Sequence, residues 1–266
     1  MRVISLTTDF GTGDFEVGVL KAVIWKIAPQ VKIADLSHEI GPQNVLEGAL
    51  LLGRCTPFFP EGSLHVVVVD PGVGTKRRVI AAHCGPQYFV GPDNGLVTLM
   101  LECAEQNGWP VKIASADQNK YWLPEISNVF HGRDIFSPLA AHLANGVPLS
   151  QIGTPIDNPV RLEIPQPQRL ESGWKAQVMN IDHFGNLSTN LRAEHLTGMG
   201  DLIVQIKDVT IRGLSQTFGE RPSGSLVALI NSEGFLEIAE VNGSAARRIN
   251  AVTHDLVEVL PIKRDA

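Results

Sequence analysis

A carboxylate and two guanidinium groups lie close together at the end of a strongly apolar segment. Residues 64–69, LHVVVV, are rich in β-branched side chains, as in a buried strand, and Asp70 follows them directly. α/β proteins place their reactive groups at such strand ends. The next residues, PGVG, can fold back and bring Arg77 or Arg78 to the carboxylate. The segment therefore predicts a charged pair at a sheet edge, although an Asp that caps a turn beside two solvated arginines explains it equally well.

A histidine in the segment FHGRD, residues 130–134, is the second candidate for chemistry. Gly, Arg and Asp follow His131 directly before a predicted helix over 135–144, whereas a core histidine is expected inside an apolar periodic segment. We therefore predict that His131 lines a site. A structural role fits better for His38, His65, His83, His142, His195 and His254.

Two carboxylates lie in the first glycine-containing loop. A strand over residues 3–6 leads to Asp9, and Asp14 precedes a predicted helix over 15–27, as in a nucleotide-binding α/β unit. Glu16 stands where the dinucleotide fingerprint has its third glycine, so the loop does not favour NAD. Carboxylates repel phosphate but accept hydrogen bonds from ribose hydroxyls, which favours a nucleoside. Capping of the following helix is the alternative interpretation of Asp14.

Composition and charge narrow the class of protein. Of the 266 residues 44% are hydrophobic and 19% charged, which is typical of a soluble globular protein, and a net charge of -6 argues against a nucleic-acid partner. Cys55, Cys84 and Cys103 lie far apart without paired Cys or His spacing, so we expect reduced thiols and no metal site. No apolar run approaches the ~20 residues that span a membrane, and the first strand excludes a signal peptide, so we expect a cytoplasmic protein without a membrane partner.

The order of the remaining elements predicts an α/β N-terminal domain with a Rossmann-like layered sheet. A turn with the sequence GPDNG, residues 91–95, is expected to have no ligand role. Further strands are predicted at 32–36, 79–83, 88–90 and 111–114, and further helices at 43–54 and 96–106.

A change of character after residue 153 divides the chain. Prolines at 155, 159, 165 and 167 exclude a helix or a central strand there, so we predict an N-terminal domain over 1–158, a linker over 159–172 and a C-terminal domain over 173–266. Short strands without a convincing helix predict an all-β barrel or sandwich in the last domain. An oligonucleotide-binding barrel would share this shape, but the acidic balance argues against it. The strands are expected at 174–181, 202–211, 225–230, 235–241 and 256–260.

Several ordered segments together resemble one known family. They are TTDFG at 7–11, VDPGVGT at 69–75, GPDNGL at 91–96, FHGRD at 130–134, DHFGN at 182–186 and NSEG at 231–234. In this order, and over nearly the whole chain, they resemble the S-adenosyl-L-methionine (SAM) hydroxide adenosyltransferases, a once uncharacterised domain family related to the fluorinating and chlorinating enzymes.

The resemblance implies that the chain hydrolyses SAM to adenosine and L-methionine as a homotrimer, with the substrate between domains of neighbouring subunits. The catalytic Asp, Arg and His of the family correspond to Asp70, Arg77 and His131, so the family pattern selects Arg77 over Arg78. By motif position, Asp9 and Asp14 contact the ribose or the sulfonium, Asn186 and Phe218 contact adenine, and Asp182 and Ser232 lie near the methionine portion. No metal or other cofactor is expected, because the sulfonium carbon is already a good electrophile.

Other functions remain as alternatives at this point. The first is a halide-using adenosyltransferase, but a tyrosine holds the place of Asp70 in the halogenating relatives and the place of His131 also differs, so the charged set favours water. Those relatives carry an arginine where this chain has Glu233, so the methionine carboxylate must be held differently here. Alternatives of another class are a sensor that binds SAM or adenosine without turnover, and an acidic scaffold protein.

Overall fold

The computed structural model describes residues 3–262, which form two compact units. Unit 1 is Met1–Glu163 and unit 2 is Ile164–Ala266. The division falls inside the segment predicted as a linker. None of the helices between residues 3 and 262 is long and apolar enough to cross a membrane.

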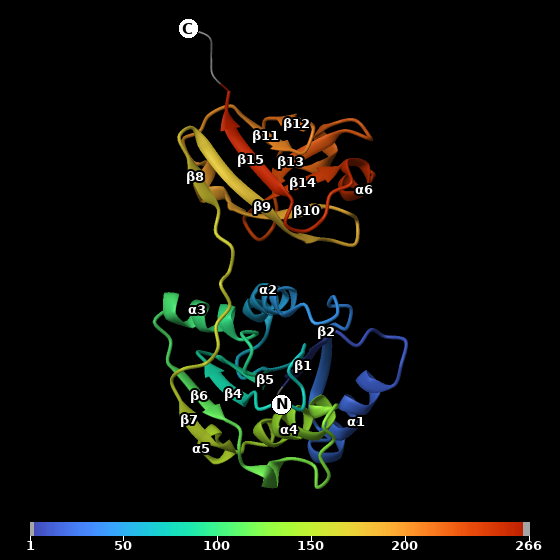
Figure 1. Cartoon of the computed structure of the whole chain (residues 1–266), viewed down its shortest axis with the longest axis vertical. Coiled ribbons are helices and arrows are strands. Elements are labelled where there is room, and N and C mark those ends of the chain that lie inside the picture. Colours follow the sequence, from blue (N-terminus) through green and yellow to red (C-terminus); the bar gives the residue numbers. More distant parts are fainter. Residues whose placement is uncertain (1–2, 263–266) are drawn as a thin grey trace. The chain divides into compact units, whose positions relative to one another are not determined.

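A mixed sheet forms the centre of unit 1 (Figure 1). Its strands are β1 Val3–Thr8, β2 Lys32–Ser37, β3 Leu64–Val68, β4 Val79–Cys84, β5 Gln87–Pro92, β6 Val111–Ser115 and β7 Thr154–Ile156. The seven strands have the order β2-β1-β3-β5-β4-β6-β7. Strands β2, β1, β3 and β5 run parallel, whereas β4, β6 and β7 pair antiparallel with their neighbours. The α/β architecture predicted from the sequence is confirmed.

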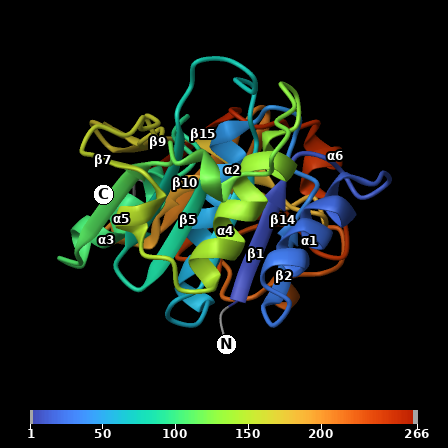
Figure 2. The ribbon, with the colours of Figure 1, turned by 90° about the horizontal axis from the view of Figure 1, so that it is seen from below.

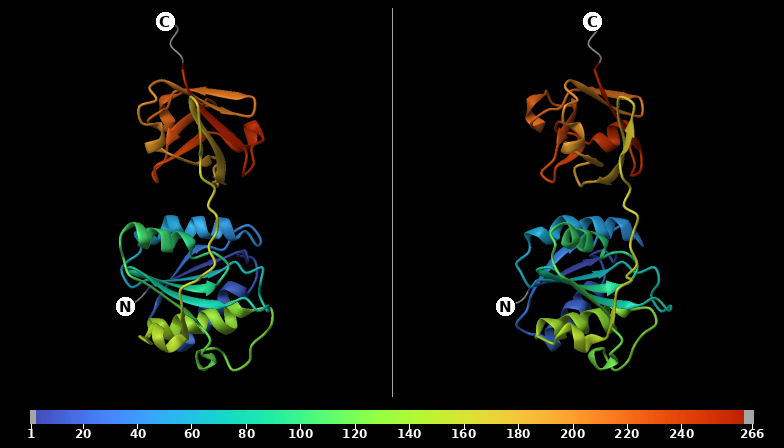
Figure 3. Two further views of the ribbon diagram at one scale, coloured as in Figure 1. Left: turned by 60° about the vertical axis from the view of Figure 1, so that its left-hand side comes forward. Right: turned by 90° about the vertical axis from the view of Figure 1, so that its left-hand side faces the viewer.

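Helices cover both faces of this sheet. Figure 2 looks onto the face covered by α1 Glu16–Ile27 and α4 Ser137–Ala144, and Figure 3 shows α2 Val45–Cys55 and α3 Thr98–Gln106 on the other face. The unit also contains the short helix α5 Leu149–Ile152, the 3-10 turns η1 Thr56–Phe58 and η2 Asn119–Tyr121, and the π-helical turn η3 Gly132–Phe136.

Strand β3 is buried on both faces of the sheet. Successive side chains of a strand point to opposite faces, so Val66 and Val68 pack with α1 and α4 whereas Val67 and Val69 pack with α2 and α3. A continuous apolar run is required because both faces are covered by helices. Asp70 therefore leaves the sheet where the apolar run ends.

Unit 2 is a nearly closed antiparallel sheet, as predicted. Its strands follow the order β12-β11-β15-β9-β10-β14-β13, and β8 pairs with β9 outside this path. The elements are β8 Gln168–Leu170, β9 Gly173–Ile181, β10 Leu187–Arg192, η4 Ala193–Leu196, β11 Leu202–Ile206, β12 Val209–Arg212, η5 Phe218–Glu220, β13 Leu226–Ile230, β14 Phe235–Glu240, α6 Ala245–Ile249 and β15 Leu256–Pro261.

Three details of unit 2 differ from the sequence prediction. The segment predicted as one strand over 202–211 is a hairpin, because the left-handed backbone of Lys207 (φ 49°) turns the chain. Strand β10 was not predicted, since its central residues are polar and are nevertheless buried. The prediction of no helix was wrong: the Ser244 side chain accepts a hydrogen bond from the Arg247 backbone and begins α6.

The three cysteines are free thiols. Cys84 is buried in unit 1, whereas Cys55 and Cys103 are half-buried. Burial, with a smaller contribution from neighbouring Cys103, raises the pKa of the Cys84 thiol to about 12. This thiol is therefore protonated and unreactive at neutral pH.

Candidate active site

The carboxyl ends of the parallel strands meet at one edge of the unit 1 sheet. The chain passes from β1 to β2 and then crosses to β3 on the other side of β1, so the strand order reverses between β1 and β3. Ligands of open α/β sheets bind outside such a point. Thr8 of β1 pairs with Val68 of β3; Asp9 comes one residue after Thr8, and Asp70 comes two residues after Val68. The topology therefore places both carboxylates at the edge where a ligand is expected.

Arg77 holds the carboxylate of Asp70 in a bidentate ion pair. Its Nε donates to Oδ1 at 2.8 Å and to Oδ2 at 3.0 Å, and its Nη2 also donates to Oδ2. The side chains of Arg77 and Asp70 are only 11% and 6% exposed. Such charge-assisted pairs fix both partners in one orientation. The loop after β3 thus folds back on its own carboxylate, and it is Arg77 rather than Arg78 that reaches it.

The same guanidinium reaches His131. Nη2 of Arg77 lies 2.9 Å from Nδ1 of the imidazole. A guanidinium has only donors, so Nδ1 accepts this bond and the proton of the neutral ring is assigned to Nε2. Desolvation and the Arg77 charge lower the pKa of His131, against smaller opposite effects of nearby carboxylates. At neutral pH the ring is therefore neutral and offers an Nε2–H donor.

Asp70, Arg77 and His131 thus form one hydrogen-bonded chain with the arginine in the middle. The carboxylate is a hydrogen-bond acceptor, and the imidazole contributes a donor on its free side. Together they can orient a water molecule and remove a proton from it.

Two close approaches bring the loop after β3 and the segment before α4 together. Gly74 has a φ of 74°, and a Cβ at this position would lie 2.2 Å from the carbonyl oxygen of Asn128. Only glycine fits such a position. A Cβ at Gly132 would lie 3.1 Å from Cγ1 of Val68 in β3. Glycine at 74 therefore lets the loop after β3 contact Asn128, and glycine at 132 lets the segment before α4 pack against Val68 at the end of β3.

Phe136 is a site residue that the sequence analysis does not single out. It ends the turn η3, is fully buried, and its ring centroid lies 5.2 Å from Cζ of Arg77. The ring face attracts the guanidinium and holds it in place. Widened helical turns often occur at functional sites. An aromatic residue beside Ile135 is typical of a protein core, so the residue types gave no sign of a role in the site. The only indication in the sequence was that Phe136 lies shortly after His131.

The carboxylates of the first loop have separate backbone partners. Oδ2 of Asp9 accepts from the backbone N–H of Gln43 at 2.8 Å. Oδ1 of Asp14 accepts from the backbone N–H of Phe15 at 2.8 Å, but Phe15 is itself the N-cap residue of α1 and no side chain caps this helix, so Asp14 does not form the bond that the capping interpretation requires. Over residues 3–262, no group of three or more His, Cys, Asp or Glu side chains is arranged to hold a metal ion.

Unit 2 carries the remaining predicted residues. Asp182 and Asn186 contact each other in the turn between β9 and β10: the backbone N–H of Asn186 donates to Oδ1 at 2.8 Å and its Nδ2 donates to Oδ2 at 2.9 Å. Ser232 is exposed in the turn between β13 and β14. Phe218 begins η5 and is 45% exposed.

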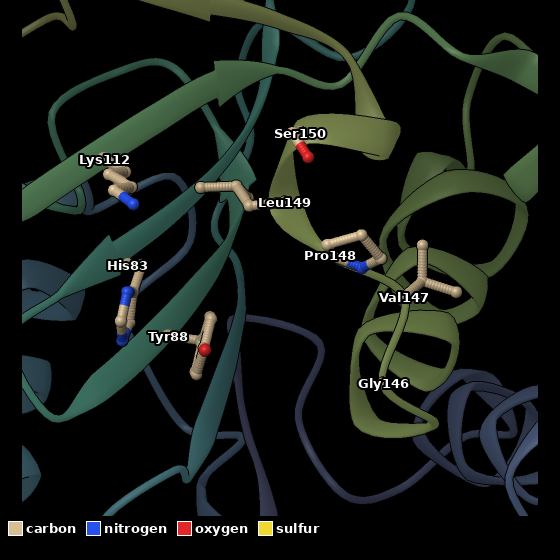
Figure 4. Close-up of a pocket in the computed structure, with 8 residues that line it drawn as sticks. All are labelled: His83, Tyr88, Lys112, Gly146, Val147, Pro148, Leu149 and Ser150. Carbon is tan, nitrogen blue, oxygen red and sulfur yellow. The ribbon is translucent and has the colours of Figure 1, made fainter.

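Unit 1 also contains a cavity of about 350 Å³, away from Asp70 (Figure 4). His83, Tyr88 and Lys112 form one wall, and residues in and before α5 form the other. The strand register pairs Tyr88 with Leu64, the first residue of β3, and pairs His83 with Tyr88 on one side and with Lys112 on the other. Asp70 follows the opposite end of β3, so this cavity is not part of the site around Asp70.

The chain matches the models of both domains of one family. The SAM hydroxide adenosyltransferase N-terminal domain matches residues 4–153, and the C-terminal domain of the same family matches residues 176–258. The chain belongs to the SAM hydroxide adenosyltransferase family. The resemblance stated from the sequence motifs is therefore confirmed.

Named relatives and a solved structure extend this similarity over both units. The (R)-S-adenosyl-L-methionine hydrolase of Thermus thermophilus is 38% identical over 269 residues, which cover 99% of each chain. The fluorinase of an Actinoplanes species is 30% identical and covers 89% of this chain and 90% of its own. The crystal structure of an uncharacterized conserved protein from Thermotoga maritima superimposes with a TM-score of 0.88 at 33% identity and covers 98% of this chain and 100% of that one.

Proposed function

We propose that this SAM hydroxide adenosyltransferase family member hydrolyses SAM, the (R) epimer being the expected substrate, to adenosine and L-methionine. The observation that supports this function most directly is the chain of Asp70, Arg77 and His131 at the carboxyl edge of the sheet. The named hydrolase is also more similar to this chain than the named fluorinase, at 38% against 30% identity. Both observations favour water over halide as the nucleophile.

The positive charge of Arg77 alone cannot generate hydroxide. Bulk water has a pKa of about 15.7, and lowering this to ~7 requires roughly 12 kcal/mol. One charge at ~4 Å supplies about 4 kcal/mol at a realistic effective dielectric. A proton acceptor is therefore needed, and Asp70 is the carboxylate that Arg77 holds in place.

In the proposed step, the water oxygen bonds to C5′ of the ribose while Asp70 accepts a proton from it. The C5′–S bond breaks, and its electron pair neutralises the sulfonium to leave the thioether of methionine. The proton then passes from Asp70 to solvent. His131 donates from Nε2 to the water oxygen and Arg77 keeps Asp70 aligned, so the attack is oriented in line with the leaving sulfur.

The substrate contacts follow the motif positions. We assign the ribose or sulfonium to Asp9 and Asp14, adenine to Asn186 and Phe218, and the methionine portion to Asp182 and Ser232. SAM is the only small molecule required, without a cofactor, because it carries its own activated leaving group.

We propose a homotrimer with its active sites at subunit interfaces. Apolar side chains are exposed in both units: Phe15 and Val129, on loops at the Asp70 edge, are 61% and 78% exposed, and Phe184 in the β9–β10 turn is 73% exposed. Single exposed apolar side chains are common on protein surfaces, so the trimer is proposed from the family resemblance, and these three side chains are candidates for burial in its interfaces. Light scattering is expected to give three times the chain mass of 28.8 kDa. The free thiols support the cytoplasm as the proposed compartment.

Product analysis tests the function directly. The purified protein is incubated with SAM, with and without chloride or fluoride, and the nucleosides are separated by chromatography. Adenosine under all conditions supports hydrolysis, whereas a halogenated nucleoside identifies a halide-using enzyme. A ligand-dependent rise in melting temperature without product identifies a sensor, and no shift at all leaves the scaffold protein.

Asp70→Asn tests the proton acceptor. The amide keeps the size of the side chain but cannot accept the proton, so we expect kcat to fall about 10²- to 10⁴-fold with KM changed by less than about threefold. Asp255→Asn, at the ion pair with Lys207 in unit 2, is the matched control and should keep the parent kcat. Equal losses in kcat and in SAM affinity would show that Asp70 binds substrate instead.

A further inference from the structure

The turn over residues 91–95, which begins at the end of β5 and leads to α3, was expected from the sequence to have no ligand role. We propose that two of its side chains, Asp93 and Asn94, are positioning residues that hold Asp70 and Arg77 in their reactive arrangement. This inference rests on the proposed hydrolysis of SAM and names residues that the hydrolysis requires but that do not touch the substrate.

Asn94 acts on the backbone of Asp70. Its Nδ2 donates to the carbonyl oxygen of Val69 at 2.9 Å, and its Oδ1 accepts from the backbone N–H of Leu96 at 3.4 Å. Val69 is fully buried and lies one residue beyond the end of β3, where its carbonyl needs a donor. Since the Val69 carbonyl belongs to the peptide unit that leads into Asp70, this bond fixes the point from which the carboxylate leaves the sheet.

Asp93 acts on the arginine side of the pair. Its backbone N–H donates to the carbonyl oxygen of Arg78 at 3.0 Å, and the same oxygen lies 3.5 Å from Nη1 of Arg77. Oδ2 of Asp93 accepts from Nε of Arg78 at 2.7 Å, and the Asp93 side chain is only 1% exposed. Asp93 thus binds Arg78 at both its backbone and its side chain, which leaves Arg77 as the arginine that faces Asp70.

The turn therefore holds both ends of the loop that connects the two reactive groups. Asn94 secures the end at Val69 and Asp93 secures the end at Arg78. The loop between them is closed by its own hydrogen bonds, from the backbone N–H groups of Val73 and Thr75 to the carbonyl oxygens of Asp70 and Gly72, so its position depends on where its two ends are held. A misplacement of about 1 Å between reacting groups can lower a rate about 10²-fold.

Asn94 is the better residue to test. Asp93 has a further partner, because its Oδ1 accepts from the backbone N–H of Val160 at 2.8 Å. Replacing Asp93 would therefore also free the segment around Val160. The two bonds of Asn94 described above both join it to backbone groups beside the site. Its replacement should therefore lower kcat without weakening SAM binding.

The experiment compares Asn94→Ala with Asn145→Ala. Nδ2 of Asn145 donates to the carbonyl oxygen of Ile27 at 2.8 Å, the same kind of bond at the end of α1. With SAM as substrate and adenosine as product, Asn94→Ala is expected to lower kcat about 100-fold and to change KM less than about threefold, as estimated for a 1 Å misplacement. Asn145→Ala is expected to keep the parent kcat, and melting temperatures of both variants measure their stability.

Asn94→Asp provides a second measurement, the pH dependence of kcat, which would not change if Asn94 served only the stability of the fold. The ionised carboxylate keeps the acceptor for Leu96 but cannot donate to Val69, whereas the protonated acid can. Its kcat, divided by that of the parent at the same pH, is therefore expected to rise as the pH falls. This variant decides the question if Asn94→Ala does not fold.

Parent-like kcat in the folded Asn94 variants, or a rise in KM that matches the fall in kcat, would overturn the positioning role while leaving the hydrolysis intact. A parent protein that forms no adenosine from SAM would instead overturn the proposed function and this inference with it.

Discussion

Replacing Arg77 with lysine tests whether the guanidinium is the link between Asp70 and His131. Lysine keeps the positive charge but lacks the planar fork that donates to both partners. We expect the bond to His131 and one bond to Asp70 to be lost. At about 1.5 kcal/mol for each charge-assisted bond, the loss is about 3 kcal/mol. Since about 1.4 kcal/mol corresponds to a factor of ten in rate, kcat should fall roughly 100-fold.

The assay is adenosine formation at saturating SAM and neutral pH, together with the melting temperature. Arg161→Lys is the matched control, because Arg161 pairs with Glu105 on the surface and the two side chains are 43% and 54% exposed. Exposed pairs contribute about 0–1 kcal/mol, so this variant should behave like the parent. If Arg77→Lys keeps kcat within about threefold of the parent, the charge alone suffices and the argument from the fork is wrong.

The pH dependence and the tight loop contact can be tested in the same way. The pKa of His131 is lowered from 6.5, and protonation of its Nδ1 breaks the bond with Arg77. We therefore expect kcat to be constant through neutral pH and to fall only below pH 6.5. A fall that begins above this pH would contradict the neutral His131 assigned above. Gly74→Ala should lower the free energy of unfolding by about 1–3 kcal/mol more than Gly62→Ala, since both have positive φ but only Gly74 faces a carbonyl oxygen 2.2 Å from the new Cβ. Chemical denaturation measures both, and equal losses would show that the contact with Asn128 does not constrain the loop.

Much of the fold could be predicted because it depends on residues that are close in sequence. The β-branched run before Asp70 has the period and burial of a strand covered on both faces. The glycine-containing loops and the helices after them follow from local conformational preferences. Strand β10 could not be predicted in this way, since its polar Ser188, Thr189 and Asn190 are buried through partners in other segments.

The candidate site was predicted in part. The motif order pointed to Asp70, Arg77 and His131, and the structure joins them by hydrogen bonds. Their chemical roles remain predictions. The positions of Phe136 and Asn94 beside these three residues were not predicted, because an aromatic residue at a helix start and an asparagine in a turn are both common in proteins.

The sequence by itself determined which reactive side chains are present. It also determined that Asp70 follows a buried strand, because strand and loop formation depend on residues close in sequence. The family resemblance selected Arg77 and His131, but only the tertiary structure shows the contacts by which Arg77 faces Asp70, Arg78 faces Asp93 and His131 lies beside Arg77. These contacts depend on the strand order and on the approach of Gly74 to Asn128. Such packing between distant segments has no counterpart in the conformational preferences of any single segment.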